Sequence, residues 1–221
     1  VLAERREVSL TNNSDAGAAD YASWLDSECR IHIVRNALDG AALDAVADSV
    51  RRELRASTGP IIGGMMRLSR AKQPELWIGV ARRFLRGHPL ATFWLFGDGP
   101  LRTKLEQRIR GLHLEGRIVL KGTATSTASA LSSVDALLVT SDVEGTPNVV
   151  LEAQWLGVPV VARPVGGIPE TIAPELLHLL ADSETGLVEA LTRAIAMERV
   201  NVSDLGRRFL RDRFAPENQL Q

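Results

Sequence analysis

The sequence predicts an α/β fold built on a parallel sheet with helices on both faces. From residue 60 onward, short and almost wholly apolar runs alternate with stretches of helical periodicity. Strands of that composition are typical of parallel sheets that are buried on both sides. Glycines and charged residues follow successive apolar runs, and in such sheets ligands bind beyond the carboxyl ends of the strands. A Rossmann-like arrangement is therefore expected.

The predicted strands share a short apolar run bounded by turn residues. They are Pro60–Met66, Thr92–Phe96, Arg117–Leu120, Asp135–Thr140, Val158–Ala162 and Leu176–Leu180. The predicted helices share apolar positions that recur at helical spacing. They are Pro74–Leu85, Leu101–Arg110, Thr127–Ser133, Pro147–Leu156 and Glu184–Met197. Pro147 is expected in the first turn of its helix, where a missing N–H costs nothing.

Three segments are expected along the chain: residues 1–58, a main domain at 59–200 and a C-terminal helical tail at 201–221. In the first, Val8–Leu25 indicates a strand residue, a loop and a helix, Ile31–Val34 is another apolar run, and Ala41–Ala56 indicates a helix. In the tail, Leu205–Leu220 is basic and amphipathic, with an interruption expected near Pro216.

Composition narrows the function classes. The 221 residues are 45% hydrophobic and 24% charged, which is ordinary for a globular protein. The formal net charge of −1 does not indicate nucleic acid as a partner. One cysteine, Cys29, excludes an internal disulfide and suits the cytoplasm. No apolar run approaches the roughly 20 residues of a transmembrane helix, and no signal-peptide core is present. Because Val1 stands where Met would begin a chain, we expect a fragment.

Basic residues and a helix start indicate a site for a diphosphate. Arg67 follows the first strand of the main domain, and Lys72 comes shortly after it. A helix N-terminus offers unpaired N–H groups and about half a positive charge. The helix near Pro147 would supply these from the backbone of Asn148, Val149 and Val150. Stabilising the charge that develops on a diphosphate leaving group is itself catalysis.

Two glutamates flank that helix start and indicate a site for a sugar and a ribose. Glu152 lies inside the helix, on the side facing back towards its start, where a carboxylate can accept hydrogen bonds from both ribose hydroxyls. Glu144 lies in the preceding loop, nearer the sugar. With Gly166 and Gly167 it would form a polar pocket with room for a hexose, since glycine lets backbone approach a ligand closely.

Each feature has an ordinary structural explanation when taken alone. A lone Arg67 or Lys72 is usually solvated, and Glu170 could simply cap the next helix start. The Gly97–Pro100 loop is more often a turn, and it lacks the Gly-x-Gly-x-x-Gly pattern of dinucleotide-binding folds. No metal is proposed, because the histidines show no ligand spacing and Ser141–Val143 is not an Asp-x-Asp motif. The occurrence of all these features in order after successive strands favours a ligand site.

As a set, these residues resemble the donor-binding half of retaining GT4 glycosyltransferases of the GT-B fold. The resemblance covers about residues 60–197 and is most specific over 135–170. It is carried by Met66–Lys72, Phe96–Pro100, Leu120–Gly122, Glu144–Glu152 and Val165–Glu170. Upstream, Leu10–Ser14 and Ile33–Asp39 resemble the end of the family's first domain.

The resemblance implies that the chain is one half of a GT-B fold, which has two Rossmann-like domains facing across a cleft. The donor would be a UDP- or GDP-sugar, used without metal or cofactor, and a hexose would be transferred with retention. Arg67, Lys72 and Glu144 would act in catalysis. The implied donor-binding residues are Gly97, Gly99, Lys121, Gly122, Thr146, Pro147, Asn148, Val149, Val150, Glu152, Gly166 and Gly167.

The acceptor implied by the resemblance is a glycan or a lipid-linked sugar, bound by an N-terminal domain that is mostly missing here. The isolated chain is therefore expected to bind a nucleotide sugar without turning it over. The family also suggests polysaccharide assembly in the cytoplasm, with possible peripheral association of the full-length protein with a membrane.

Other functions stay open on sequence grounds. A nucleotide-sugar epimerase or sugar-phosphate transferase of the same fold would need a further acid or base in the pocket. A non-catalytic scaffold domain would have no nucleotide affinity. A dehydrogenase-type domain ranks last, because the first strand carries no glycine fingerprint.

Overall fold

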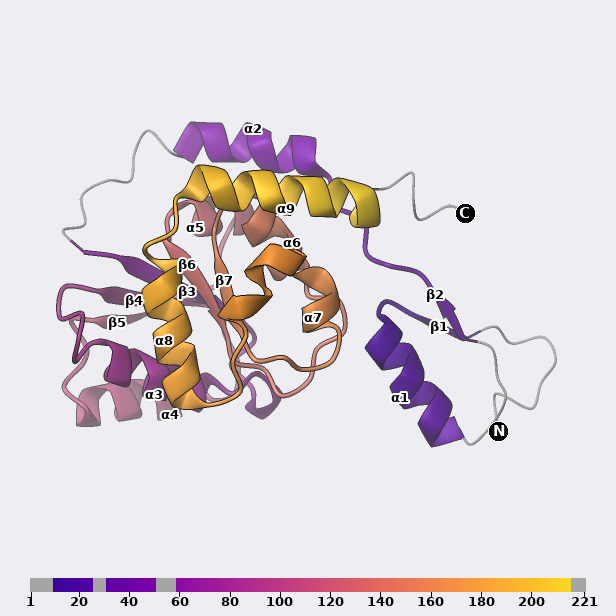
Figure 1. The fold of residues 1–221 in the computed structure, drawn as a ribbon. Coiled ribbons are helices and arrows are strands. Elements are labelled where there is room, and N and C mark those ends of the chain that lie inside the picture. The colour runs from indigo at the N-terminus through magenta and orange to yellow at the C-terminus, as the bar shows by residue number, and fades with distance from the viewer. Residues whose placement is uncertain (1–9, 26–30, 51–58, 216–221) are drawn as a thin grey trace.

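The computed structural model describes residues 10–25, 31–50 and 59–215. Its larger sheet has five parallel strands in the order β5-β4-β3-β6-β7, which confirms the predicted parallel α/β architecture (Figure 1). The strands are β3 (Ile61–Met65), β4 (Thr92–Phe96), β5 (Ile118–Gly122), β6 (Ala136–Val139) and β7 (Val160–Ala162).

Helices cover both faces of this sheet, and alternate strand residues point to different helices. In β6, Ala136 and Leu138 pack with one group of helices, whereas Leu137 and Val139 pack with the other. This is the two-residue period of a strand. The first group is α3 (Pro74–Phe84), α4 (Arg102–Gly111) and α8 (Glu184–Ala194), and the second is α5 (Thr127–Ser132), α6 (Asn148–Trp155) and α9 (Arg199–Phe214).

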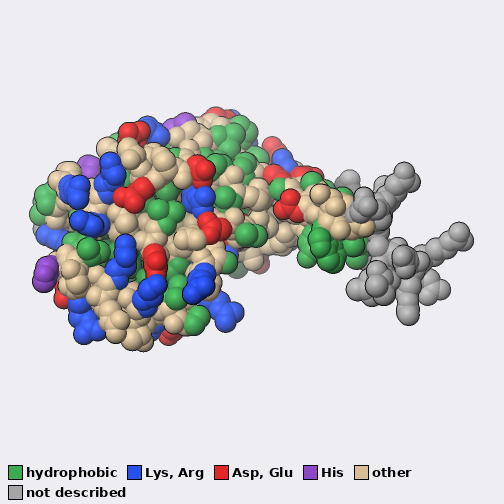
Figure 2. Space-filling model, turned by 90° about the horizontal axis from the view of Figure 1, so that it is seen from below, with side chains coloured by type: hydrophobic (Ala, Val, Ile, Leu, Met, Phe, Trp, Pro, Cys, Tyr) green, Lys and Arg blue, Asp and Glu red, His purple; other side chains and the backbone are tan. Residues whose placement is uncertain are grey.

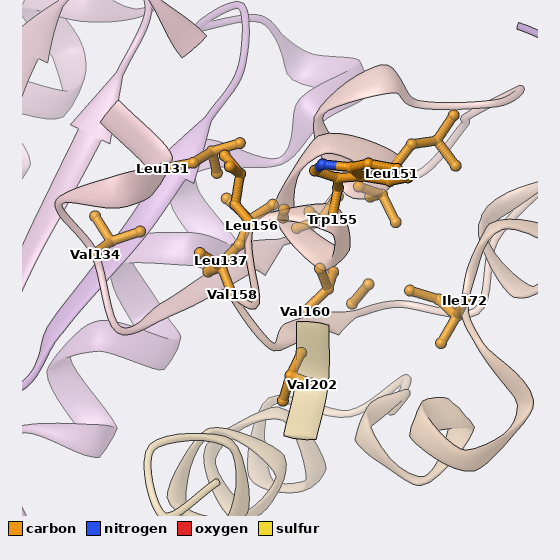
Figure 3. Packing of buried hydrophobic residues seen from close by; sticks show 14 of the residues in the cluster. Leu131, Val134, Leu137, Leu151, Trp155, Leu156, Val158, Val160, Ile172 and Val202 are labelled. Atoms are coloured by element: carbon orange, nitrogen blue, oxygen red, sulfur yellow. The ribbon is translucent and has the colours of Figure 1, made fainter. Parts of the chain in front are cut away.

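Aromatic residues anchor α3 on the sheet. The helix begins at Pro74, as predicted. Trp77 and Phe84 are fully buried, and both meet Phe93 of β4 edge to face, with ring centroids 5.4 and 5.7 Å apart. Edge-to-face pairs stabilise a core beyond their burial alone. On the other face, Leu151 and other side chains of α6 fill the space above β6 and β7 (Figure 3).

The predicted strand Leu176–Leu180 is wrong. Pro174–Leu179 forms a 3₁₀-helix, η2, and only Leu180 bridges to β7, at Ala162. Pro174 starts this turn because its fixed φ suits a helical first position and its missing N–H does not suit a strand. Leu176 and Leu179, three positions apart, are both buried, while Leu177 is exposed. Side chains three apart share one face of a 3₁₀-helix.

Several helix boundaries differ from the prediction; α8, for example, ends at Ala194 and not at Met197. Helix α6 begins at Asn148, and Pro147 is its extended N-cap residue, outside the first turn. The C-terminal helix α9 begins at Arg199 and buries Val202, Leu210 and Phe214 in the core. The expected interruption near Pro216 lies outside the described residues. Two short segments complete the main unit, η1 (Arg70–Lys72) and α7 (Ile168–Thr171).

The N-terminal residues form a small parallel pair of strands to one side of the larger sheet (Figure 1). Here β1 (Leu10–Asn12) pairs with β2 (Ile31–Ile33), and α1 (Asp15–Leu25) connects them. Helix α2 (Gly40–Val50) then packs on α5 and α6. The predicted continuation of α2 to residue 56, the strand residue Val8 and Cys29 lie outside the described residues.

Charged side chains of both signs are interspersed on the face of the molecule seen in Figure 2. This mixture agrees with the net charge of −1. In the part of the chain that the structure describes, no helix is long and apolar enough to cross a membrane.

Candidate functional site

The segments that carry the candidate residues meet at the carboxyl edge of the larger sheet. All five strands are parallel, so the loops after them emerge on one side. The Leu68 amide donates to the Asp98 carbonyl at 2.9 Å, and the Gly97 amide donates to the Gly122 carbonyl at 2.7 Å. The loops after β3, β4 and β5 are thus fastened to one another by their backbones.

Lys72 and Glu144 form the central ion pair of this edge. The Lys72 Nζ lies 2.6 Å from the Glu144 Oε1, and the Ser141 hydroxyl donates to the same oxygen at 2.6 Å. The side chains of Lys72 and Glu144 are 29% and 13% exposed, respectively. Shielding from water strengthens the Coulombic attraction within such a pair, and the loss of Lys72 would leave a poorly solvated carboxylate with few partners. The structure therefore brings together two of the three predicted catalytic residues.

A second polar cluster, which sequence reasoning missed, supports this pair. The Thr140 hydroxyl lies 3.1 Å from the carbonyls of both Lys72 and Gln73, which holds η1 against the end of β6. Asp142 accepts hydrogen bonds from Gln73 and from Arg163. The Gln73 hydrogen bond and then the Arg163 guanidinium lower the pKa of Asp142. These partners are far apart in sequence, so no local pattern could reveal them.

Arg67 stands apart from this cluster. Its side chain is exposed, and among the described residues it makes no ion pair or side-chain hydrogen bond. Its position after β3 still places it at the carboxyl edge of the sheet. The next residue, Leu68, donates its amide to the Asp98 carbonyl. An exposed guanidinium keeps its donors available for an anion.

Glu152 is a half-buried glutamate whose carboxylate has an oxygen without a hydrogen-bond partner among the described residues. Within the described part of the chain, its Oε2 is buried and accepts no hydrogen bond. Burial raises the pKa of this carboxyl above its usual range. A buried acceptor without a donor costs free energy. Such residues are candidates for ligand contacts because a ligand can supply the missing donor.

The start of α6 is only partly available to a ligand. We predicted that Asn148, Val149 and Val150 would offer backbone N–H groups, but the Val150 amide already donates to the Pro147 carbonyl at 3.0 Å. The Val150 amide is thus engaged in the turn Pro147–Val150, and a ligand contact at Val150 stays a prediction. The amide of the predicted donor-binding residue Thr146 is also engaged, since it donates to the Asn13 side chain at 3.3 Å.

Gly166 and Gly167 lie against protein backbone, a reason for glycine that the sequence pattern does not reveal. Gly166 has a φ of +51°, and a Cβ added there would lie 1.9 Å from the Glu144 carbonyl oxygen. A Cβ on Gly167 would lie 2.4 Å from the Gly145 carbonyl oxygen. The Gly167 amide donates to the Glu144 carbonyl at 3.1 Å. The two glycines thus bring the loops after β6 and β7 into contact and so position Glu144.

Gly166→Ala is expected to destabilise the protein by roughly 2–4 kcal/mol, because left-handed strain and a backbone clash act together. Urea unfolding would measure the change. Gly111→Ala is the matched control, since a Cβ at Gly111 meets nothing within 4 Å and alanine suits a helix. Equal stabilities of the two variants would contradict the assigned contact.

Of the remaining predicted residues, Gly97 and Gly99 lie on the loop after β4, and Lys121 and Gly122 are the last two residues of β5. Gly97 has a φ of +124°, in the region that favours glycine. The Gly99 amide donates to its neighbour Asp98 at 2.7 Å. The Lys121 ammonium lies 4.6 Å from the centre of the Trp94 ring, a cation–π contact. Among the described residues, no group of His, Cys, Asp or Glu could hold a metal ion.

The chain is similar in sequence to known glycosyltransferases. A family model described as "Glycosyl transferases group 1" matches residues 59–197. The Vi polysaccharide biosynthesis protein VipC/TviE of Salmonella typhi is 28% identical over 96% of this chain and 39% of its own length. The 2-deoxystreptamine N-acetyl-D-glucosaminyltransferase of Streptomyces fradiae is 31% identical over 71% of this chain and 41% of its own length. The chain thus spans about two fifths of these relatives.

Solved structures of GT-B glycosyltransferases share the fold. A TarM mutant of S. aureus, in complex with Fondaparinux, alpha-GlcNAc-glycerol and UDP, matches with a TM-score of 0.80 and 20% identity over 96% of this chain and 42% of that chain. Anabaena HepE in complex with UDP and glucose matches with a TM-score of 0.79 and 21% identity over 96% of this chain and 61% of that chain.

Proposed function

The chain belongs to the group 1 family of glycosyltransferases, and from this premise we propose that it forms the nucleotide-sugar-binding part of a retaining hexosyltransferase of GT4 type. The proposed reaction transfers a hexosyl group from a UDP- or GDP-sugar to a glycan or a lipid-linked acceptor. The acceptor would bind to the rest of the full-length protein.

The observation that carries this proposal is the unpartnered carboxylate of Glu152. Its Oε2 is buried without a hydrogen-bond donor among the described residues. The ribose of a nucleotide has two neighbouring hydroxyls, and a carboxylate can accept both. Charged hydrogen bonds of this kind are stronger than neutral ones. Ribose binding would therefore explain why an unsatisfied carboxylate is retained on α6.

The diphosphate would bind between Lys72 and Arg67. The Lys72 ammonium has three N–H donors, so it can hold Glu144 and still donate to a phosphate oxygen. When the bond from the anomeric carbon to the diphosphate breaks, both electrons leave with the diphosphate oxygen. Two cations beside that oxygen stabilise the charge it gains in the transition state.

Glu144 would orient the transferred sugar. Its Oε1 is held by Lys72 and Ser141, so the carboxylate has a defined position from which its other oxygen can accept a sugar hydroxyl. The Anabaena and S. aureus structures named above hold UDP, in one case with glucose. Their contents support a nucleoside-diphosphate sugar as the donor here.

Titration of the 221-residue chain with UDP and GDP tests this function. We expect one of the two to bind, and Arg67→Ala to weaken its affinity about tenfold, as is typical of a lost charged hydrogen bond. Calorimetry would give both affinities. Arg82→Ala is the control, because Arg82 is an exposed arginine of α3 that lies outside the proposed site.

The alternatives make different predictions for the same titration. A scaffold domain would bind neither nucleotide. An epimerase would convert the sugar of a bound donor without any acceptor, which NMR of the sugar signals would reveal. For the proposed glycosyltransferase we expect binding but no sugar transfer by the 221-residue chain alone, and transfer by this chain would overturn that part of the proposal.

A further inference from the structure

Two loops carry proposed donor residues: the first donor loop (residues 140–147) follows β6, and the second donor loop (residues 163–167) follows β7. Glu170, in the short helix α7 directly after the second donor loop, binds the start of a helix that lies far away in the sequence. Its two carboxylate oxygens accept hydrogen bonds from the backbone amides of Asp15 at 2.9 Å and Ala16 at 2.7 Å. These amides are the first of α1, where helical N–H groups have no partner within the helix. A carboxylate is favoured there because the helix dipole is positive at that end.

This contact is additional to the usual local cap. The Ser14 hydroxyl already accepts the Gly17 amide at 3.0 Å, as an N-cap residue does. Glu170 satisfies the two preceding amides, which Ser14 does not reach. Taken alone, Glu170 could have capped the next helix start along the chain; the structure instead shows it at the start of α1.

A second fastening joins the N-terminal residues to the first donor loop. The Asn36 amide group donates to the Thr146 carbonyl at 2.9 Å and to the Asn148 side chain at 2.6 Å. The Asn13 carbonyl accepts the Thr146 hydroxyl. Asn13 and Asn36 follow the parallel strands β1 and β2, so they meet at one end of this small sheet. The loop before α6 is thus held from the N-terminal side.

We propose that Glu170 and Asn36 are positioning residues that fasten the N-terminal segment (residues 10–36) onto both donor loops, so that nucleotide binding and the placement of α1 are coupled. This inference rests on the proposed function, because the loops in question carry the donor residues Glu144 and Gly166. The coupling is reciprocal: whatever holds α1 in place helps nucleotide binding, and nucleotide binding protects α1.

Hydrogen exchange of the 221-residue chain, with and without the nucleotide that binds in titration (UDP or GDP), measures this coupling. In the unsubstituted chain, nucleotide is expected to slow exchange of the Asp15 and Ala16 amides. In Glu170→Gln, the side-chain NH₂ group faces an amide donor and cannot accept from it. We expect about tenfold faster exchange at these amides, no further slowing by nucleotide, and an affinity weaker by about threefold to tenfold.

Two further variants keep the test decisive if Glu170→Gln perturbs folding. Asn36→Ala removes the hydrogen bonds from Asn36 to Thr146 and Asn148 while those of Asn13 remain, and it should weaken nucleotide affinity to a similar extent. Glu175→Gln, at an exposed glutamate of η2, should change neither readout. Without nucleotide, high salt should speed exchange of the Asp15 and Ala16 amides in the unsubstituted chain but not in Glu170→Gln, because the capping carboxylate is charged.

The outcomes separate this inference from the function it rests on. If Glu170→Gln and Asn36→Ala both bind nucleotide as tightly as the unsubstituted chain, the positioning role is overturned and the donor site stands. If nucleotide binds but leaves exchange of α1 unchanged, the coupling is overturned. If the unsubstituted chain binds neither UDP nor GDP, the proposed function fails and this inference fails with it.

Discussion

Glu152→Gln is expected to weaken nucleotide affinity by about 100-fold while making the protein more stable. The carboxylate would accept hydrogen bonds from two ribose hydroxyls, and each bond to a charged group contributes about 1.5–3 kcal/mol. An amide offers one acceptor and places a donor against the second hydroxyl. Calorimetric titration of the 221-residue chain would measure the change.

The gain in stability has a separate cause. Without ligand, the buried Oε2 of Glu152 has no donor among the described residues, and an amide tolerates burial better than a carboxylate does. Relief of about 1 kcal/mol would raise the melting temperature by about 2–4 °C for a chain of this size. A substitution that weakens binding while it stabilises the fold is expected at a residue that is retained for function and not for stability.

The pH dependence of this variant follows from the pKa of Glu152, which burial raises. A carboxyl with a higher pKa in the folded state than in the unfolded state binds protons more readily when folded. Its ionised form therefore lowers the free energy of unfolding above the folded-state pKa, and this penalty disappears as pH falls through that value. The stability advantage of Glu152→Gln should accordingly shrink as pH is lowered from 7.

Glu189→Gln serves as the control for both readouts, because Glu189 is an exposed glutamate on α8. It should change neither nucleotide affinity nor melting temperature. If Glu152→Gln bound nucleotide as tightly as the unsubstituted chain does, ribose recognition by Glu152 would be ruled out.

Lys72→Met is expected to remove most of the preference for a nucleoside diphosphate over a monophosphate. The proposed contact of the ammonium is with the diphosphate, so the affinity for UDP or GDP should fall by about 10- to 100-fold. Affinity for the corresponding monophosphate should change less. Parallel titrations of the diphosphate and the monophosphate against both proteins give the ratio of affinities directly.

The same substitution should also lower stability, because Glu144 loses its cation while 13% exposed. Lys104→Met is the matched control: Lys104 pairs with Glu75 at 2.7 Å, but its side chain is 67% exposed. Exposed pairs contribute about 0–1 kcal/mol. Adding Glu144→Gln to Lys72→Met should recover part of the lost stability without restoring diphosphate preference. Restored preference in that double variant would contradict the role of Lys72.

Strands and helices were predictable where local pattern and tertiary environment agree. The apolar run of β6 reflects a strand that is buried on both faces. The amphipathic spacing of α3 reflects a helix that is buried on one face. Leu176–Leu180 misled the prediction because a short apolar run suits either a strand or a helical turn. The structure forms the helical turn, because Pro174 suits its first position and because the turn buries both Leu176 and Leu179.

The candidate site was predictable in its residue types but not in its contacts. Arg67, Lys72, Glu144 and Glu152 could be singled out because charged residues beyond parallel strands converge on one edge. That Lys72 pairs with Glu144 could not be foreseen, because the two residues are joined only through the order of β3 and β6 in the sheet.

By itself, the sequence determined the α/β class, the order of most elements, and the residues at the carboxyl edge that identify the family. These depend on periodicity and on turn chemistry, which act between near neighbours. The tertiary structure decided which groups meet: Gly166 lies against Glu144, Glu170 lies on α1, and the Glu152 Oε2 has no donor among the described residues. Such contacts depend on which distant segments the packed sheet brings together, and no pattern of neighbouring residues specifies that.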